Sequence, residues 1–169
     1  MDDFRQRILD RALQGLLFAR DMTDKDLTQV LQIEQNAQAS PWGRLSFEES
    51  LTRCQDSKNN ACRVLLVDND ILAYHIVSSV LDELHILNVV VMRNLQGIGL
   101  GHRLLQDIID FAMNKSLKKI FLEVRVSNVV AQSLYTKWQF KHIGMRKKYY
   151  RNLDPNEPKE DAMIYVREL

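Results

Sequence analysis

Cysteine is scarce in this chain of 169 residues, which holds only Cys54 and Cys62, and its four histidines are scattered. No Cys-x-x-Cys pair occurs, so a structural zinc site of the usual spacing is excluded and we expect no metal. A chain of this length buries a core of its own without staples. The two thiols are therefore expected to be reduced and packed, with a disulfide between them as the alternative.

An excess of charge of one sign is also lacking. Lys and Arg number 23 against 22 Asp and Glu, giving a net charge of +1, so no overall field attracts nucleic acid or an anionic membrane. The apolar run at 16–19 is too short for a secretory signal, and no stretch approaches the roughly 20 apolar residues of a membrane span. We expect a cytoplasmic monomer or weak dimer without a nucleic-acid or membrane partner.

The apolar pattern predicts one mixed α/β domain over 16–169, preceded by an N-terminal extension, 1–15. A short amphipathic helix over 3–14 packs on the domain edge or, alternatively, binds a partner. Strands are expected at 16–20, 63–68, 71–81, 85–92, 120–126, 140–149 and 162–166, with a loop at 151–161. Helices are expected at 23–39, 46–54, 100–115 and 128–138, the first two opening on capping boxes at Thr23 and Ser46.

A glycine-rich loop joins the apolar strand at 85–92 to the helix at 100–115, which makes a βαβ unit. It contains Gly97, Gly99 and Gly101, three of the six glycines in the chain. Glycines allow close approach of a ligand to backbone N–H groups, and the helix N-terminus favours an anion, so phosphate is the natural ligand. The spacing matches neither G-x-G-x-x-G nor the P-loop, and a glycine-rich connection without a ligand is the alternative.

The run Gln96-x-x-Gly99-x-Gly101 resembles the Q/R-x-x-G-x-G/A signature of the Gcn5-related N-acetyltransferases. The likeness spans residues 16–167 and extends to the bacterial RimI family. It is carried by Ile33-Glu34-Gln35, Ser40-Pro41-Trp42, the strand 87–91, Leu122-Glu123-Val124-Arg125-x-Ser127-Asn128, Leu134-Tyr135 and Arg146-x-x-Tyr149-Tyr150. It implies a mixed, mostly antiparallel sheet of six to seven strands with flanking helices. It also implies transfer of acetyl from acetyl-CoA to the N-terminal alanine of a small-subunit ribosomal protein, number eighteen.

The resemblance implies that Glu123 is the general base, acting through a water, and that Tyr135 is the general acid. From the residues alone, an ion pair of Glu123 with Arg125 on the same strand face and a packed aromatic at Tyr135 are the favoured interpretations. An N-terminal amine, with a pKa of about 7.7–8.0, is partly neutral at pH 7, whereas lysine, near 10.4, is not. A single carboxylate is therefore an adequate base for an α-amine.

The resemblance also implies contacts to the coenzyme and to the peptide. The expected coenzyme contacts are Val89, Val90, Val91, Gly97, Ile98, Gly99, Leu100, Gly101, His102 and Asn128. Asn128 is alternatively a plain N-cap. Trp42, Tyr149 and Tyr150 border the substrate groove or only pack. Gly97 and His102 replace residues that are commonly basic in the family, and whether these changes weaken the expected phosphate contacts stays open.

Two other functions stay open at this point. The chain is either an acetyltransferase of the same fold that takes another protein N-terminus, a lysine or a small amine, or a non-catalytic module that binds coenzyme A. The presence of both Glu123 and Tyr135 argues against the second alternative.

Overall fold

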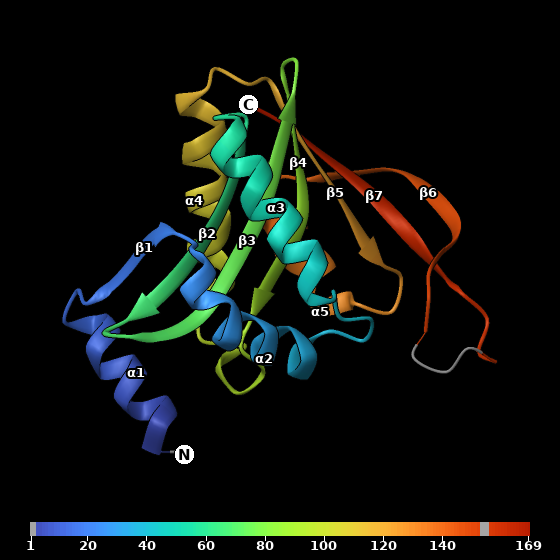
Figure 1. Ribbon diagram of the computed structural model, residues 1–169. Coiled ribbons are helices and arrows are strands. Elements are labelled where there is room, and N and C mark those ends of the chain that lie inside the picture. The colour runs from blue at the N-terminus through green and yellow to red at the C-terminus, as the bar shows by residue number, and fades with distance from the viewer. Residues whose placement is uncertain (1–2, 153–155) are drawn as a thin grey trace.

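A seven-stranded sheet forms the centre of the computed structural model, which describes residues 3–152 and 156–169 (Figure 1). The strand order is β1-β2-β3-β4-β5-β7-β6. The strands are β1 (Leu17–Asp21), β2 (Asn60–Val67), β3 (Asp70–Val80), β4 (Glu83–Val91), β5 (Lys119–Arg125), β6 (Lys141–Tyr150) and β7 (Glu160–Glu168). β4 and β5 run parallel, and the other neighbouring pairs are antiparallel. The predicted mixed sheet around a βαβ unit is confirmed.

Helices pack on both faces of this sheet. They are α1 (Asp3–Leu13), α2 (Leu27–Ala37), α3 (Arg44–Asp56), α4 (Leu100–Asn114) and α5 (Val129–Lys137). α2 and α3 share one apolar cluster with β2 and β3, whereas α4 and α5 share another with β4 and β5 on the opposite face. Among the helices of the described residues, none combines the length and apolar character needed to cross a membrane.

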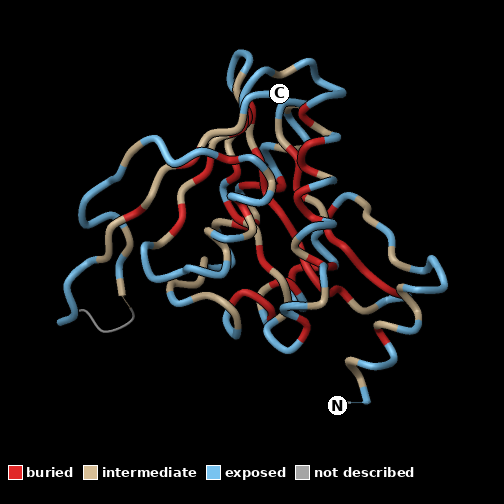
Figure 2. The backbone as a smooth tube through the Cα atoms, turned by 180° about the vertical axis from the view of Figure 1, so that it is seen from behind, coloured by how far each residue is buried: buried red, intermediate tan, exposed pale blue. Residues whose placement is uncertain are grey.

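β5 follows the predicted alternation. Ile120, Leu122 and Val124 are buried, while Glu123 and Arg125 are only half-buried on the other face. The apolar side chains pack beneath α4 and α5. Buried residues are concentrated in the strands at the centre of the sheet, such as β3, whereas β6 at the sheet edge is largely exposed (Figure 2). Glu123 therefore lies on the half-buried face of β5, separated by one strand from the exposed edge strand β6.

The ends of two helices test the capping predictions. The amide of Thr23 donates to the Asp26 carboxylate at 2.8 Å, as a capping box requires. The second capping box is wrong, because α3 begins at Arg44 after the N-cap Gly43, and Ser46 lies inside the helix. An extended Gly43 opens the helix with no side-chain cap, which sequence spacing does not reveal.

The N-terminal helix is observed as α1 and packs on the domain through the buried Ile8. The division of the chain at residue 16 stays a prediction. Residues 1–2 of the expected extension and 153–155 of the expected loop lie outside the described residues.

Candidate active site

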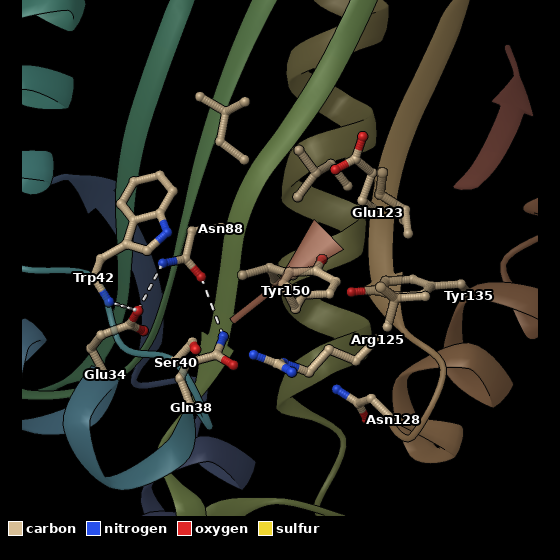
Figure 3. A pocket seen from close by; sticks show the side chains of 15 residues that line it. Glu34, Gln38, Ser40, Trp42, Asn88, Glu123, Arg125, Asn128, Tyr135 and Tyr150 are labelled. Carbon is tan, nitrogen blue, oxygen red and sulfur yellow. Dashed lines mark hydrogen bonds between the residues drawn. The ribbon is translucent and has the colours of Figure 1, made fainter. Parts of the chain in front are cut away.

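The parallel pair of β4 and β5 is hydrogen-bonded over only half of its length. Register runs from Glu83 opposite Lys119 to Ile86 opposite Leu122, and no pairing follows beyond that point. A cavity of about 120 Å³ lies where the strands separate (Figure 3). Its walls are Glu34, Gln38, Ser40, Trp42, Ile86, Leu87, Asn88, Val89, Leu122, Glu123, Val124, Arg125, Asn128, Tyr135 and Tyr150.

Glu123 does not pair with its strand neighbour. Its Oε1 lies 3.0 Å from Nε of Arg146 on β6. A hydrogen bond between the Tyr149 hydroxyl and Glu123, followed by burial, raises the pKa of Tyr149. The alternative in which Glu123 pairs with Arg125 is wrong, because Arg125 instead bonds Glu160 at 2.8 Å. Arg146 and Tyr149 thus hold Glu123 from across β7.

Arg125 organises the floor of the cavity. Its Nη2 donates to the carbonyl of Arg151 at 2.8 Å, and its guanidinium lies 4.5 Å from the ring centre of Tyr150. Glu160 also accepts from the amide of Ser127 at 2.6 Å. Although burial acts to raise it, the hydrogen bonds from Ser127 and Arg125 leave the pKa of Glu160 below its usual value. Arg125 therefore fixes Tyr150 in the cavity wall, where burial raises the pKa of the phenol.

Tyr135 is packed as an aromatic residue and also lines the cavity. Its ring packs 5.8 Å from that of Phe140 and 6.3 Å from that of Tyr165, while its hydroxyl is directed into the cavity (Figure 3). Burial raises the pKa of Tyr135, so the phenol is protonated at neutral pH. Asn128 caps α5 by accepting from the amide of Ala131 at 3.1 Å, which confirms the N-cap interpretation, and it also lines the cavity.

A buried carboxylate, Glu34, forms the opposite wall and was not among the predicted site residues. It accepts from the amide of Trp42 at 2.7 Å and from Nδ2 of Asn88 at 3.3 Å, and the Tyr74 hydroxyl also donates to it. The sequence does contain a signal, because an acid on the apolar stripe of a helix needs a partner. The hydrogen bond from its amide to Glu34 holds Trp42 in place, and the ring of Trp42 packs with its centre 5.7 Å from that of Phe47.

The three glycines of the loop serve two different purposes. Gly97 and Gly99 have φ of +82° and +95°, a left-handed conformation that favours glycine. A Cβ on Gly101 would lie 2.9 Å from Cδ2 of Leu134, so this glycine permits close packing of α4 on α5. Nε2 of Gln96 donates to the carbonyl of Val91 at 3.2 Å, which ties the loop to the end of β4.

Backbone donors are free along the loop and on one edge of β4. Within the part of the chain that the structure describes, no backbone carbonyl accepts from the amides of residues 97–101. The amide of Met92 bonds Leu72 on β3, so strand alternation turns the amides of Val91 and Val89 toward the separated β5. Unpaired amides at a helix N-terminus are an anion-binding arrangement, and the residues present therefore fit a diphosphate.

His102 has a partner of its own. Its Nδ1 accepts from the indole N–H of Trp138 at 2.7 Å. Because an indole N–H only donates, the Nδ1 atom of His102 is the acceptor in this bond. The structure thus places Trp42, Val89, Glu123, Asn128, Tyr135 and Tyr150 in one cavity, whereas Val90, Val91, the loop residues 97–102 and Tyr149 lie outside its lining.

Comparison with known proteins agrees with this architecture. Residues 27–140 match the acetyltransferase (GNAT) family. The [ribosomal protein bS18]-alanine N-acetyltransferase of Salmonella typhimurium is 32% identical over 143 residues, which cover 85% of this chain and 91% of that protein. The crystal structure of the ribosomal-protein-S18-alanine N-acetyltransferase from Escherichia coli is similar with a TM-score of 0.79 and 30% identity, covering 90% of this chain and 93% of that one.

A GNAT family acetyltransferase from Elizabethkingia anophelis, solved with acetyl-CoA bound, shares the fold with a TM-score of 0.71 and 20% identity, over 91% of this chain and 99% of that one. Fold and relatives together define an acyltransferase enzyme. The chain belongs to the acetyltransferase (GNAT) family. The resemblance inferred from the loop signature and the strand motifs is confirmed.

Proposed function

We propose that this enzyme is an acetyl-coenzyme A-dependent Nα-acetyltransferase that acts on the N-terminal alanine of ribosomal protein S18. The observation that carries the proposal is that a carboxylate, Glu123, and a phenol, Tyr135, line one cavity between the separated ends of β4 and β5. The names of relatives about 32% identical supply the acceptor. An enzyme that modifies ribosomal proteins works in the cytoplasm.

Acetyl-coenzyme A supplies the acetyl group as a thioester. The unpaired amides of residues 97–101 and the N-terminus of α4 hold the diphosphate. The amides of Val89 and Val91 bind the arm of the coenzyme along the edge of β4, as an added strand does. Asn128 lies at the far side of the same cavity and contacts the coenzyme while capping α5.

The chemistry requires one proton to leave the amine and one to reach the sulfur. Glu123 accepts the proton that the acceptor amine loses, through a water, as nitrogen bonds the acetyl carbon. Tyr135 donates its proton to the sulfur as the carbon–sulfur bond breaks. An inward-facing backbone amide of β4 stabilises the developing oxyanion. No metal takes part in the proposed step.

The peptide enters beside the aromatic residues at the cavity mouth. Trp42 and Tyr150 line the cavity, and Tyr149 packs edge-on against Tyr150 with ring centres 5.0 Å apart. Tyr149 also interacts with Glu123, so the acceptor amine passes Tyr149 and Tyr150 to reach the base. An N-terminal residue as small as alanine suits a cavity of about 120 Å³.

The direct test is acetylation of a hexapeptide that begins with alanine. We expect coenzyme A release, followed with a thiol reagent, and one acetyl group on the α-amine by mass spectrometry. The matched control is the same hexapeptide with a blocked N-terminus and an internal lysine. Acetylation of the control alone would replace the proposal with a lysine acetyltransferase. Calorimetric binding of coenzyme A without turnover of any amine would indicate a non-catalytic module.

A further inference from the structure

The two cysteines lie against each other outside the site described above. Cys54 is in the last turn of α3 and Cys62 is in β2, and their Sγ atoms are 3.1 Å apart. Both are free thiols, Cys62 buried and Cys54 half-buried. A disulfide bond is about 2.05 Å long, so a movement of roughly 1 Å would join the sulfurs.

Local hydrogen bonds hold the two cysteines in this position. The turn between α3 and β2 is fixed because the amide of Ser57 and the side chain of Asn60 both donate to the carbonyl of Arg53, at 3.1 and 3.0 Å. The hydrogen bond with Cys62 lowers the pKa of Cys54. The same bond, together with burial, raises the pKa of Cys62. Because the thiolate is the nucleophilic form, these opposite directions favour Cys54 as the attacking sulfur.

Small molecules can reach Cys54. Cys54 borders a cavity of about 460 Å³ that is also lined by Cys62, Lys58, Lys115 and Asp21. The two lysines are exposed, whereas the charge of Asp21 opposes ionisation of Cys54 and acts to raise its pKa. This cavity is lined by different residues from the one around Glu123.

The geometry points to Cys54 and Cys62 as a modification site, a dithiol that a peroxide oxidises to an intramolecular disulfide. The Cys54 thiolate attacks one peroxide oxygen, which forms a sulfenic acid and releases the other oxygen as water after protonation. The Cys62 sulfur then displaces the hydroxyl from Cys54, which forms the S–S bond and releases a second water. Two thiols are oxidised and one hydrogen peroxide is reduced to two waters.

Trypsin provides a clean readout, because cleavage after Arg53, Lys58 and Arg63 places the cysteines on separate peptides, 54–58 and 59–63. After treatment of the full chain with hydrogen peroxide and alkylation, we expect the two peptides to be joined and to separate on reduction with dithiothreitol. In the control Cys62→Ser, Cys54 should form a sulfenic acid. In Cys54→Ser, Cys62 should react at least about tenfold more slowly. Two cysteines that stay alkylatable, or that oxidise separately without a cross-link, would overturn the proposal.

A different observation concerns α1, which lies outside the residues that match the family. Arg5 donates from Nη1 to the carbonyl of Asn94 at 3.1 Å and from Nη2 to that of Gln96 at 3.4 Å. The helix is held there because Ile8 packs in one cluster with Leu95, which precedes the glycine loop, and Leu100, which lies within it. The N-terminal helix therefore touches the backbone of the loop directly.

We infer that Arg5 is a positioning residue for coenzyme binding, an inference that rests on the proposed function. A trans peptide places its C=O and the following N–H on opposite sides. By holding the carbonyl of Gln96, Arg5 turns the amide of Gly97 away from α1, and this amide is the first of the unpaired series 97–101.

The test compares two arginines of the same helix. Arg7 pairs with Asp70 at 3.0 Å on the β2–β3 hairpin and is the control. Arg5→Ala should weaken coenzyme A binding about fivefold by calorimetry and raise KM for acetyl-CoA equally, with kcat unchanged. Arg7→Ala should change neither. Equal binding by wild type and Arg5→Ala, or equal weakening by both variants, would overturn the inference. Absence of binding by the wild type would instead refute the proposed function.

Discussion

The two halves of the β4–β5 pair differ in what they bury. In the paired half, from Glu83 to Ile86 on β4, Leu84 and its partner Ile120 are fully buried. In the separated half the cavity is lined by polar as well as apolar side chains, and amides of β4 face it unpaired. One pair of strands thus stabilises the core at one end and leaves hydrogen-bonding capacity for a ligand at the other.

The separation has a local cause. β3 and β4 change register between Ile76 and Val77, and Leu87 is left without a partner on β3. A bulge bends a strand and increases its twist. β5 does not follow, because it is paired with β7 from Lys119 to Arg125. The cavity therefore opens at the residue where β4 bends away.

The largest effect is expected in the paired half. Leu84→Ala should lower the free energy of unfolding by roughly 2–5 kcal/mol, since a fully buried leucine leaves a cavity. Urea unfolding measures this loss, and coenzyme A affinity of the folded variant should stay within twofold. Leu87→Ala, at a position that is 43% exposed in the separated half, is the control and should cost under about 1 kcal/mol. A smaller loss for Leu84 than for Leu87 would contradict the comparison.

In the separated half, Tyr135→Phe should lower kcat about 100-fold, the ordinary contribution of a general acid. The ring contacts with Phe140 and Tyr165 remain, so the melting temperature should hold. Steady-state kinetics and calorimetry separate the two effects. The control Phe140→Leu should change stability more than kcat. Wild-type turnover by Tyr135→Phe would exclude the phenol from the reaction.

Glu123→Gln should reduce turnover at least about tenfold and leave coenzyme affinity nearly unchanged, because the amide cannot accept the amine proton. The neighbouring carboxylate Glu160 serves as the control. Glu160→Gln disturbs Arg125 and Ser127 and should act mainly on stability. The kcat of both variants, measured with the alanine hexapeptide, decides the matter, and unaltered turnover by Glu123→Gln would remove this residue from the mechanism.

Local patterns predicted the elements better than the contacts between them. The alternation in β5 was sufficient to place Glu123 on the strand face opposite to that of Leu122 and Val124, because the two-residue period of a strand is a property of the backbone. The partner of Glu123 was not predictable in the same way. Arg146 reaches it from β6 across β7, and two register shifts between β6 and β7 set that approach. Such irregularities depend on packing and leave no mark in the spacing.

The contact between Glu34 and Asn88 could not be predicted from the sequence, although each residue stands out in its own element. Glu34 follows Ile33 on the apolar side of α2, and Asn88 interrupts an apolar strand. Each polar residue alone suggests a local exception, and only the fold shows that the two side chains meet. The glycine loop was the opposite case, because residue type alone marked a loop that tolerates the positive φ observed at Gly97 and Gly99.

The smallest effect expected is a dependence of stability on pH, which arises at His75 on β3, next to the separated half of β4. His75 on β3 pairs in register with Val89 and is fully buried. Its Nε2 lies 2.7 Å from one carboxylate oxygen of Asp107 on α4. The other oxygen of Asp107 accepts from Arg63 on β2 at 2.5 Å. Burial, the main influence, lowers the pKa of His75 despite Asp107. Although burial acts to raise it, bonds from His75 and Arg63 lower the pKa of Asp107.

The unfolded chain therefore takes up a proton on His75 near pH 6.5 and the folded chain does not. Stability should be level above about pH 6.5 and fall below it, by at most about 1.4 kcal/mol per pH unit for this one group. The contribution of Asp107 is lost only at lower pH, as its carboxylate is protonated. Urea unfolding at pH 7.5, 6.5 and 5.5 measures the slope, and His75→Gln should flatten it in this window. An identical slope in wild type and variant would contradict the prediction. It would show that His75, the β3 partner of Val89, contributes no pH dependence to the free energy of unfolding, as is the case for the apolar pair of Leu84 and Ile120.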